Sequence, residues 1–146
     1  MTERDAAFLA EIQEEASLAG LAHIYPPELY PFPGEAVRKR WREYAGGYRL
    51  VDDVGFVAVT PPWLEALYVR PQAWGSGVAD ELHAWAIEEL RAACVATARL
   101  WVLEANARAR RFYERRGWCA DGTSRVVEFP PHPLDLGYSL ALQSTP

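Results

Sequence analysis

Residues 64–79 read Leu64-Glu65-Ala66-Leu67-Tyr68-Val69-Arg70-Pro71-Gln72-Ala73-Trp74-Gly75-Ser76-Gly77-Val78-Ala79, and a segment rich in alanine and leucine follows to residue 94. The apolar start is typical of a strand, and the three- and four-residue spacing of apolar side chains after residue 78 predicts a helix. A glycine-rich turn between a strand and a helix lets backbone N–H groups at the helix start bind an anion. We expect this turn to hold the pyrophosphate of a cofactor.

The composition bounds the class of protein. Half of the 146 residues are apolar and 24% are charged, which is typical of one globular domain with a core. There is no apolar run of about 18 residues, and the polar start of the chain lacks the apolar segment of a signal peptide. The net charge of −5 disfavours a nucleic-acid partner. Cys94 and Cys119 have no metal-type spacing, so we expect reduced thiols in a cytoplasmic protein.

The first half of the chain predicts two helices and a meander of strands. Apolar residues from Asp5 to Leu21 recur at helical spacing, and a second helix is expected at Gly34–Tyr44. Between them, residues 23–33 hold four prolines and three aromatic residues, which predicts a loop. From Tyr48 the period becomes two, with strands expected at Tyr48–Val51, Val54–Val59 and Trp63–Val69.

The second half predicts a crossover. A helix is expected at Val78–Cys94, and the strand Arg99–Leu103 alternates so little that we expect burial on both of its faces. A helix at Ala107–Arg116 follows. The remaining strands are expected from Trp118, continuing through Arg125–Phe129, and at Leu136–Leu142. The order of elements predicts a single α/β (α+β) domain with a mixed central sheet flanked by helices.

The glycine turn fits neither common nucleotide motif. A P-loop needs Gly-Lys-Ser/Thr, but Val78 follows Gly77, and a dinucleotide turn needs a small residue where Asp80 stands. The turn resembles the acyl-CoA loop of the GNAT (GCN5-related) N-acetyltransferase family, Gln/Arg-x-x-Gly-x-Gly/Ala. Counted from the preceding strand, Gly77 and Ala79 take the two small positions and Trp74 replaces Gln/Arg. A register beginning at Gln72 also matches the letters, but it starts two residues too early.

A second segment resembles the same family. Residues 106–118 read Asn106-Ala107-Arg108-Ala109-Arg110-Arg111-Phe112-Tyr113-Glu114-Arg115-Arg116-Gly117-Trp118, similar to Asn-x-x-Ala-x-x-Phe-Tyr-x-x-x-Gly-Phe. The two motifs come in the family's order and at its spacing, and the resemblance covers about residues 48–118. It implies one N-acetyltransferase domain over residues 1–146. Members of the family normally open with a strand, for which only Met1–Arg4 remain here.

The resemblance implies where acetyl-CoA would bind. Strands 64–69 and 99–103 would splay apart to admit the pantetheine arm, which would pair with the backbone of Leu67, Tyr68 and Val69. The Val69 N–H would polarise the thioester carbonyl. The pyrophosphate would meet the N–H groups of Gly75, Ser76, Gly77, Val78, Ala79 and Asp80. The second motif adds Asn106, which can also cap its helix, and Phe112, which can also be a core residue.

Two residues are expected to take part in catalysis. In the family, the tyrosine at the position of Tyr113 lies near the thioester sulfur and can protonate the departing thiolate. Glu65 is the expected base, since strand alternation puts it on the face of Leu67 and Val69; a cross-strand ion pair is the alternative. Three loop residues could overhang the site: His23, Glu28 and His132. The arginines of 108–116 are expected to pair with Glu88 or Glu89, although Arg108 or Arg111 could meet the 3′-phosphate.

The function that the resemblance implies is transfer of an acetyl group from acetyl-CoA to a primary amine, by direct attack in a ternary complex without a metal. The alternative is a non-catalytic acyl-CoA-binding or regulatory module on the same fold. The acceptor stays open among small amines, antibiotics, amino acids, peptides and proteins. Neither a nucleic acid nor a membrane is an expected partner. A homodimer is an expectation from the family, in which dimers are common.

Overall fold

The computed structural model describes residues 1–142. The first half contains the helices α1 (Glu3–Gly20) and α2 (Gly34–Glu43) and the strands β1 (Gly47–Val51), β2 (Gly55–Thr60) and β3 (Trp63–Val69). A 3-10 turn, η1 (Pro71–Ala73), leads to the second half, which contains α3 (Val78–Ala92), β4 (Thr97–Leu103), α4 (Ala107–Glu114), β5 (Cys119–Val126) and β6 (Leu134–Ala141). No strand precedes α1 among the described residues, as the sequence indicates.

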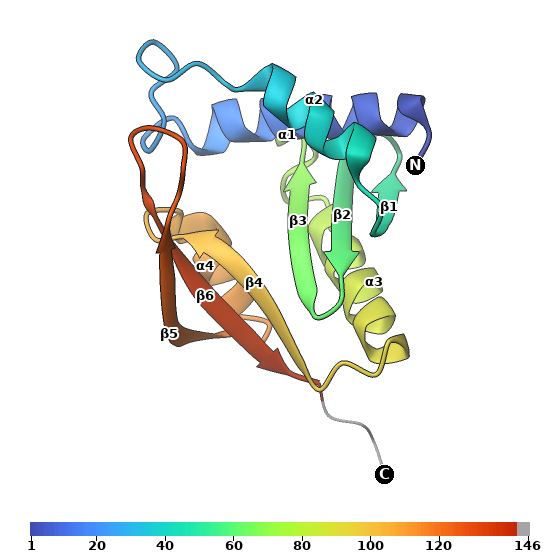
Figure 1. Cartoon of the computed structure of the whole chain (residues 1–146). Coiled ribbons are helices and arrows are strands. Elements are labelled where there is room, and N and C mark those ends of the chain that lie inside the picture. Colours follow the sequence, from blue (N-terminus) through green and yellow to red (C-terminus); the bar gives the residue numbers. More distant parts are fainter. Residues whose placement is uncertain (143–146) are drawn as a thin grey trace.

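The six described strands form one mixed sheet in the order β1-β2-β3-β4-β6-β5. Every neighbouring pair is antiparallel except β3 and β4, which are parallel and share a single register pair, Trp63 with Arg99. At this pair the Arg99 N–H donates to the Pro62 carbonyl at 2.9 Å. Beyond it the strands diverge, and α1 and α2 lie at the open end of the resulting V, over the half-sheet of β1–β3 (Figure 1). The predicted mixed sheet with splayed strands is therefore confirmed.

Local sequence signals explain where elements begin and turn. The Thr2 hydroxyl caps α1 by accepting from the Asp5 N–H at 3.1 Å. The hairpin between β1 and β2 turns at Asp52 and Asp53, which both have positive φ (49° and 55°), a conformation that aspartate tolerates better than most residues. Asn106 caps α4 as predicted, accepting from the Ala109 N–H at 3.2 Å.

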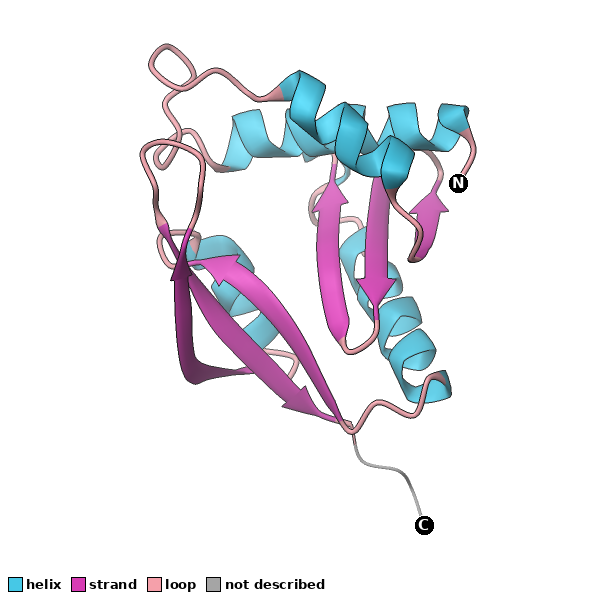
Figure 2. Cartoon of the chain, in the orientation of Figure 1, coloured by secondary structure: helices cyan, strands magenta, loops and turns pink. Residues whose placement is uncertain are grey.

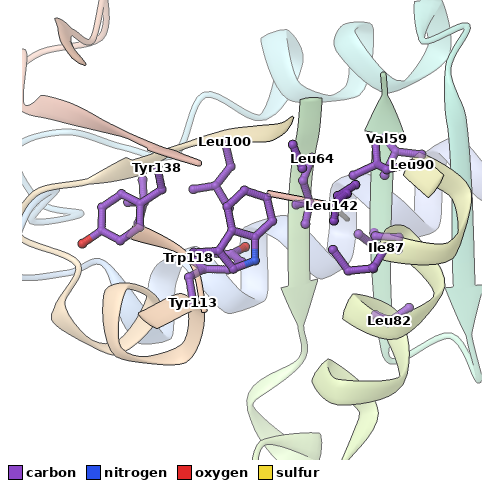
Figure 3. Close-up of a cluster of buried hydrophobic side chains, with 14 of the residues drawn as sticks. Val59, Leu64, Leu82, Ile87, Leu90, Leu100, Tyr113, Trp118, Tyr138 and Leu142 are labelled. Carbon is purple, nitrogen blue, oxygen red and sulfur yellow. The ribbon is translucent and has the colours of Figure 1, made fainter. Parts of the chain in front are cut away.

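Helices lie on both faces of the sheet (Figure 2), and each face carries a separate apolar cluster. On one face, α1 and α2 cover β1–β3, and the buried Trp41 indole donates to Gln13 at 2.8 Å. On the other face, α3 and α4 pack in one cluster with residues of β1–β4 and β6. Figure 3 shows this second cluster, which contains Leu82, Ile87 and Leu90 of α3 together with Tyr113, Trp118 and Tyr138 from the C-terminal half.

Burial of β4 on both faces was the wrong expectation. Ala98, Leu100 and Val102 are buried, whereas the alternate residues Arg99, Trp101 and Leu103 are half-buried. On that second face Trp101 stacks on Trp63 at 5.8 Å, with the Arg99 and Arg125 guanidinium groups over the two rings. β4 is therefore fully buried on one face only. Its sequence looks apolar throughout because Trp101, on the other face, is partly covered by Trp63. The last hairpin also shifts slightly: Trp118 is buried just before β5, and β5 ends at Val126.

We predict that His83 makes stability depend on pH. His83 of α3 is buried, accepts a hydrogen bond from the Trp118 indole at 3.0 Å, and has its pKa lowered by burial. The unfolded chain therefore binds a proton at His83 more readily than the native chain does, so stability falls as pH drops below about 6.5.

The matched variant is His83→Gln, which keeps an acceptor for Trp118 but does not titrate. In urea unfolding at pH 7 and pH 5, the wild type should lose more stability on acidification than the variant. Equal losses in both proteins would contradict the role of His83.

Candidate active site

The edge of β3 that faces the V carries unpaired backbone groups. The Arg70 N–H donates to the Val54 carbonyl on the β2 side at 2.7 Å. Successive amides of a strand point to opposite edges, so the N–H groups of Val69 and Leu67 point toward β4, which has already diverged. The same alternation turns the backbone of Tyr68 toward β2. The expected backbone contact of Tyr68 is therefore not supported by its direction.

Trp74 closes the upper end of this edge. Its indole N–H donates to the Val69 carbonyl at 2.8 Å, and its ring lies against Gly20 at the end of α1. The Arg108 guanidinium of α4 lies over the same ring, 3.4 Å from its centroid. Trp74 therefore links the end of β3 with α1 and α4.

The glycine turn after Trp74 presents free donors. Gly75 and Gly77 have positive φ (79° and 93°), and a Cβ on either would meet no atom of the protein within 4 Å. Among residues 1–142, no hydrogen bond is found from the N–H groups of Gly75, Gly77, Ala79 and Asp80. The turn and the first turn of α3 thus form an open cradle of donors at the positive end of a helix, which suits an anion.

Asp80 would repel an anion in this cradle if its charge were unopposed. Its carboxylate is paired with Arg116, whose guanidinium also donates to the Phe112 carbonyl at 2.7 Å and stacks on the Phe112 ring at 3.6 Å. The predicted pairing of the 108–116 arginines with Glu88 or Glu89 is wrong for Arg116, and Glu88 pairs with Arg91 instead. The Asp80 charge is therefore balanced by α4.

Tyr113 lies in the cluster shown in Figure 3, in edge contact with Phe112 and Trp118. Burial, and to a smaller extent the neighbouring Tyr68, raise the pKa of Tyr113, so its hydroxyl keeps its proton. The hydroxyl finds no hydrogen-bond partner in the described chain, and no side-chain oxygen or nitrogen there is both fully buried and unpaired. The Tyr113 hydroxyl therefore reaches accessible space as a free donor.

Hydrogen bonds fix the helix that carries Tyr113. The Tyr138 hydroxyl of β6 donates to Glu114 at 2.6 Å and accepts from Arg110 at 2.9 Å, and Arg110 also donates to the Glu104 carbonyl at 3.0 Å. Phe112, on the same helix, is half-buried against His83. This network explains why α4 keeps one orientation toward the V.

Glu65 does not lie on the predicted face. The β2–β3 register shifts between Ala58 and Val59, so Val59 opposes Leu64 while Ala58 opposes Ala66, and Glu65 is the extra residue of a β-bulge. Leu64, Leu67 and Val69 belong to the α3 side, whereas the Glu65 carboxylate meets Arg40 of α2 at 3.4 Å. The expectation of one face shared with Leu67 and Val69 is corrected by this bulge. The alternative of an ion pair holds, with α2 in place of a neighbouring strand.

The structure brings together Asp135 and Tyr25, two residues that the sequence analysis did not predict to be near the site. Asp135 of β6 is buried and paired with Arg125 at 3.0 Å. Burial first, and then the charge of Asp135, raise the pKa of Tyr25 to about 12. Burial is also the main cause of the raised pKa of Tyr68, and the charge of Asp135 adds to it. Tyr25 belongs to the proline-rich loop, and nothing in the sequence of this loop predicts that Asp135 lies near it.

The loop residues expected to overhang the site have different fates. The His23 ring hydrogen-bonds the Ala105 carbonyl at 2.9 Å, which ties the α1–α2 loop to the turn between β4 and α4. The His132 ring hydrogen-bonds the Val127 carbonyl within its own hairpin, and Glu28 is exposed.

Residues 1–142 contain no helix able to cross a membrane. The same residues hold no cluster of three or more His, Cys, Asp or Glu side chains placed to bind a metal.

The sheet with its V, the donor cradle and the free tyrosine hydroxyl describe an acyl-transferase fold. The model of the acetyltransferase (GNAT) family matches residues 3–118, and the chain belongs to this family. No curated protein sequence matches it significantly.

Several solved structures share the fold. A GCN5-related N-acetyltransferase from Rhodopseudomonas palustris has 20% identity and a TM-score of 0.76, covering 97% of this chain and 92% of its own. The PaiA N-acetyltransferase of Thermoplasma acidophilum, in complex with coenzyme A, has 17% identity and a TM-score of 0.65, with 94% of each chain covered. YncA of Salmonella typhimurium, a putative acetyltransferase with acetyl-CoA, has 15% identity and a TM-score of 0.69, covering all of this chain and 93% of its own.

Proposed function

We propose that this protein is an acetyl-CoA-dependent N-acetyltransferase that moves an acetyl group to a primary amine by direct attack in a ternary complex. The observation that carries the proposal is the V itself: free amides on the edge of β3 lead directly to the open donor cradle at the start of α3. We include a cytoplasmic location in the proposal, because Cys94 and Cys119 are both free thiols.

The residues present fit the cosubstrate. Gly75 and Gly77 leave room for phosphate oxygens, and the free N–H groups of Gly75, Gly77, Ala79 and Asp80 would hold the pyrophosphate. The N–H groups of Ser76 and Val78, also expected there, already donate to the Ala73 carbonyl and to the Ser76 hydroxyl. The pantetheine amides would pair with β3 at Leu67 and Val69 in place of a neighbouring strand, beside Asn106 and Phe112 of α4. When bound, acetyl-CoA supplies an acetyl group activated as a thioester.

Three groups of the protein would serve the transfer. The Val69 N–H, already aimed into the V, would donate to the thioester oxygen as negative charge develops there. The Tyr113 hydroxyl would donate its proton to the departing sulfur. Glu65 would accept the proton of the amine; its pair with Arg40 is half-exposed, and such pairs contribute little stability, so an ammonium group can replace Arg40.

A screen of amines tests the activity. Small polyamines, amino acids, aminoglycosides and peptides are offered with acetyl-CoA, and release of free CoA is measured. At least one class of amine should release CoA well above the hydrolysis background. If acetyl-CoA binds and no amine in the panel reacts, the proposed transferase activity is wrong.

Gly77→Ala should weaken acetyl-CoA binding. The new methyl group enters the cradle, and we expect a roughly tenfold higher Kd by calorimetry, about 1.4 kcal/mol. Gly122→Ala of β5 is the matched control, since Gly122 also has positive φ and open space around it. Both variants should lose about 1–2 kcal/mol of stability through backbone strain. Equal affinities in the two variants would count against the cradle.

Tyr113→Phe should lower kcat by roughly 10²-fold and leave the Kd of acetyl-CoA within about twofold, because it removes a proton donor and little packing. Tyr48→Phe, which loses a hydroxyl bonded to Asp5 at 2.7 Å away from the V, should keep full activity. Since burial raises the pKa of Tyr113, the wild type should show no loss of kcat through tyrosine ionisation between pH 7 and 10. Unchanged turnover in Tyr113→Phe would remove Tyr113 from the mechanism.

Glu65→Gln tests the base. The amide keeps the shape of the side chain but cannot take a proton, so kcat should fall about tenfold or more with the Kd of acetyl-CoA unchanged. Glu81→Gln is the control, because it also removes one carboxylate from a half-exposed pair, with Arg49. A change of less than twofold at Glu65 would assign the base to another group.

A further inference from the structure

Arg108 differs from its neighbours on α4 in what it contacts. Arg110 and Arg116 both bond oxygen atoms of the protein. Among residues 1–142, no carboxylate forms an ion pair with Arg108 and no acceptor takes a hydrogen bond from it. Its guanidinium lies instead over the Trp74 ring. Arg108 is an exposed residue, and partial burial of its guanidinium lowers the pKa of the group, which stays charged at neutral pH. Arg108 is thus an exposed cation stacked on Trp74, with no anion bound to it among residues 1–142.

The platform under Arg108 is itself fixed. The Trp74 indole is hydrogen-bonded to the Val69 carbonyl and lies against Gly20, so the ring position is set by β3 and α1 together. The guanidinium carbon of Arg108 lies over this ring, and a cation–π contact of this kind uses none of the N–H groups, which stay available to a ligand. Trp74 directly precedes Gly75, so Arg108 is held on the residue that leads into the cradle. The Asp80 carboxylate at the cradle is already paired with Arg116 and leaves the charge of Arg108 unopposed.

From this geometry we propose that Arg108, held on Trp74, is a ligand of the cosubstrate pyrophosphate, adding a side-chain cation to the free backbone donors of the cradle. The inference rests on the proposed binding of acetyl-CoA. Trp74 occupies the position at which the family motif has a side-chain donor. In this chain the cation comes from α4, on the other side of the V. Because the stack already orders the long arginine side chain, binding the phosphate costs little further conformational entropy.

The test compares Arg108→Ala with Arg115→Ala by calorimetry. Arg115 is an exposed arginine at the C-terminal end of the same helix, so both variants remove one positive charge and only Arg108→Ala removes the donor stacked on Trp74. We expect acetyl-CoA to bind Arg108→Ala tenfold or more weakly than the wild type, and Arg115→Ala within twofold. 3′-Dephospho-CoA, which keeps the pyrophosphate, should show the same ratio. Trp74→Leu should also weaken binding, and adding it to Arg108→Ala should cause little further loss.

Three results would overturn the proposal in distinguishable ways. Equal affinities of the two arginine variants would remove Arg108 from the site and leave the proposed function intact. A loss for acetyl-CoA that disappears with 3′-dephospho-CoA would assign Arg108 to the 3′-phosphate instead. If the folded wild type binds neither acetyl-CoA nor 3′-dephospho-CoA, the proposed function itself is wrong. Circular dichroism of each variant establishes that it is folded.

Discussion

Beyond the pair of Trp63 and Arg99, strands β3 and β4 face each other without inter-strand hydrogen bonds. An amide that loses its partner away from water costs about 1–3 kcal/mol, so a sheet opens in its middle only where other contacts hold the two halves. Here β4 is held by a full antiparallel ladder with β6, and β3 by its ladder with β2. The open V is therefore a consequence of two well-paired half-sheets joined at one point.

The two ends of the V are fixed by different contacts. At the closed end, Trp63 and Trp101 stack across the join, and buried Leu64 and Ala98 pack on the opposite face. At the open end, the chain leaves β3 through Arg70, which is buried and bound to Glu11 and Glu15 of α1 and to the Asp53 carbonyl. Since α1 packs on the half-sheet of β2 and β3, and His23 after α1 is bonded to the Ala105 carbonyl after β4, the width of the opening depends on α1 and its loop as well as on the sheet.

The sequence predicted the order of elements and the position of the cradle because both depend on local signals. Periodicity identified the helices and the meander, and Asn106 and Gly77 marked the starts of α4 and α3. The sequence did not predict the bulge at Glu65. Strand alternation assumes an unbroken register, and no residue within 63–69 indicates that one is extra. The roles of Trp74 and Asp135 depend on partners that are distant in sequence, Arg108 and Tyr25 among them, so only the folded chain brings them together.

Trp74 shows how one substitution in a motif changes several contacts at once. A flexible polar side chain at this position could donate to a ligand but could not support a guanidinium. The indole uses its single N–H on the Val69 carbonyl, so the strand edge keeps the Val69 N–H free while its carbonyl is satisfied. The ring face then takes Arg108, which connects α4 with the end of β3 across the V. The same residue that removes a donor from the motif thus fixes the strand edge and the helix on which Tyr113 lies.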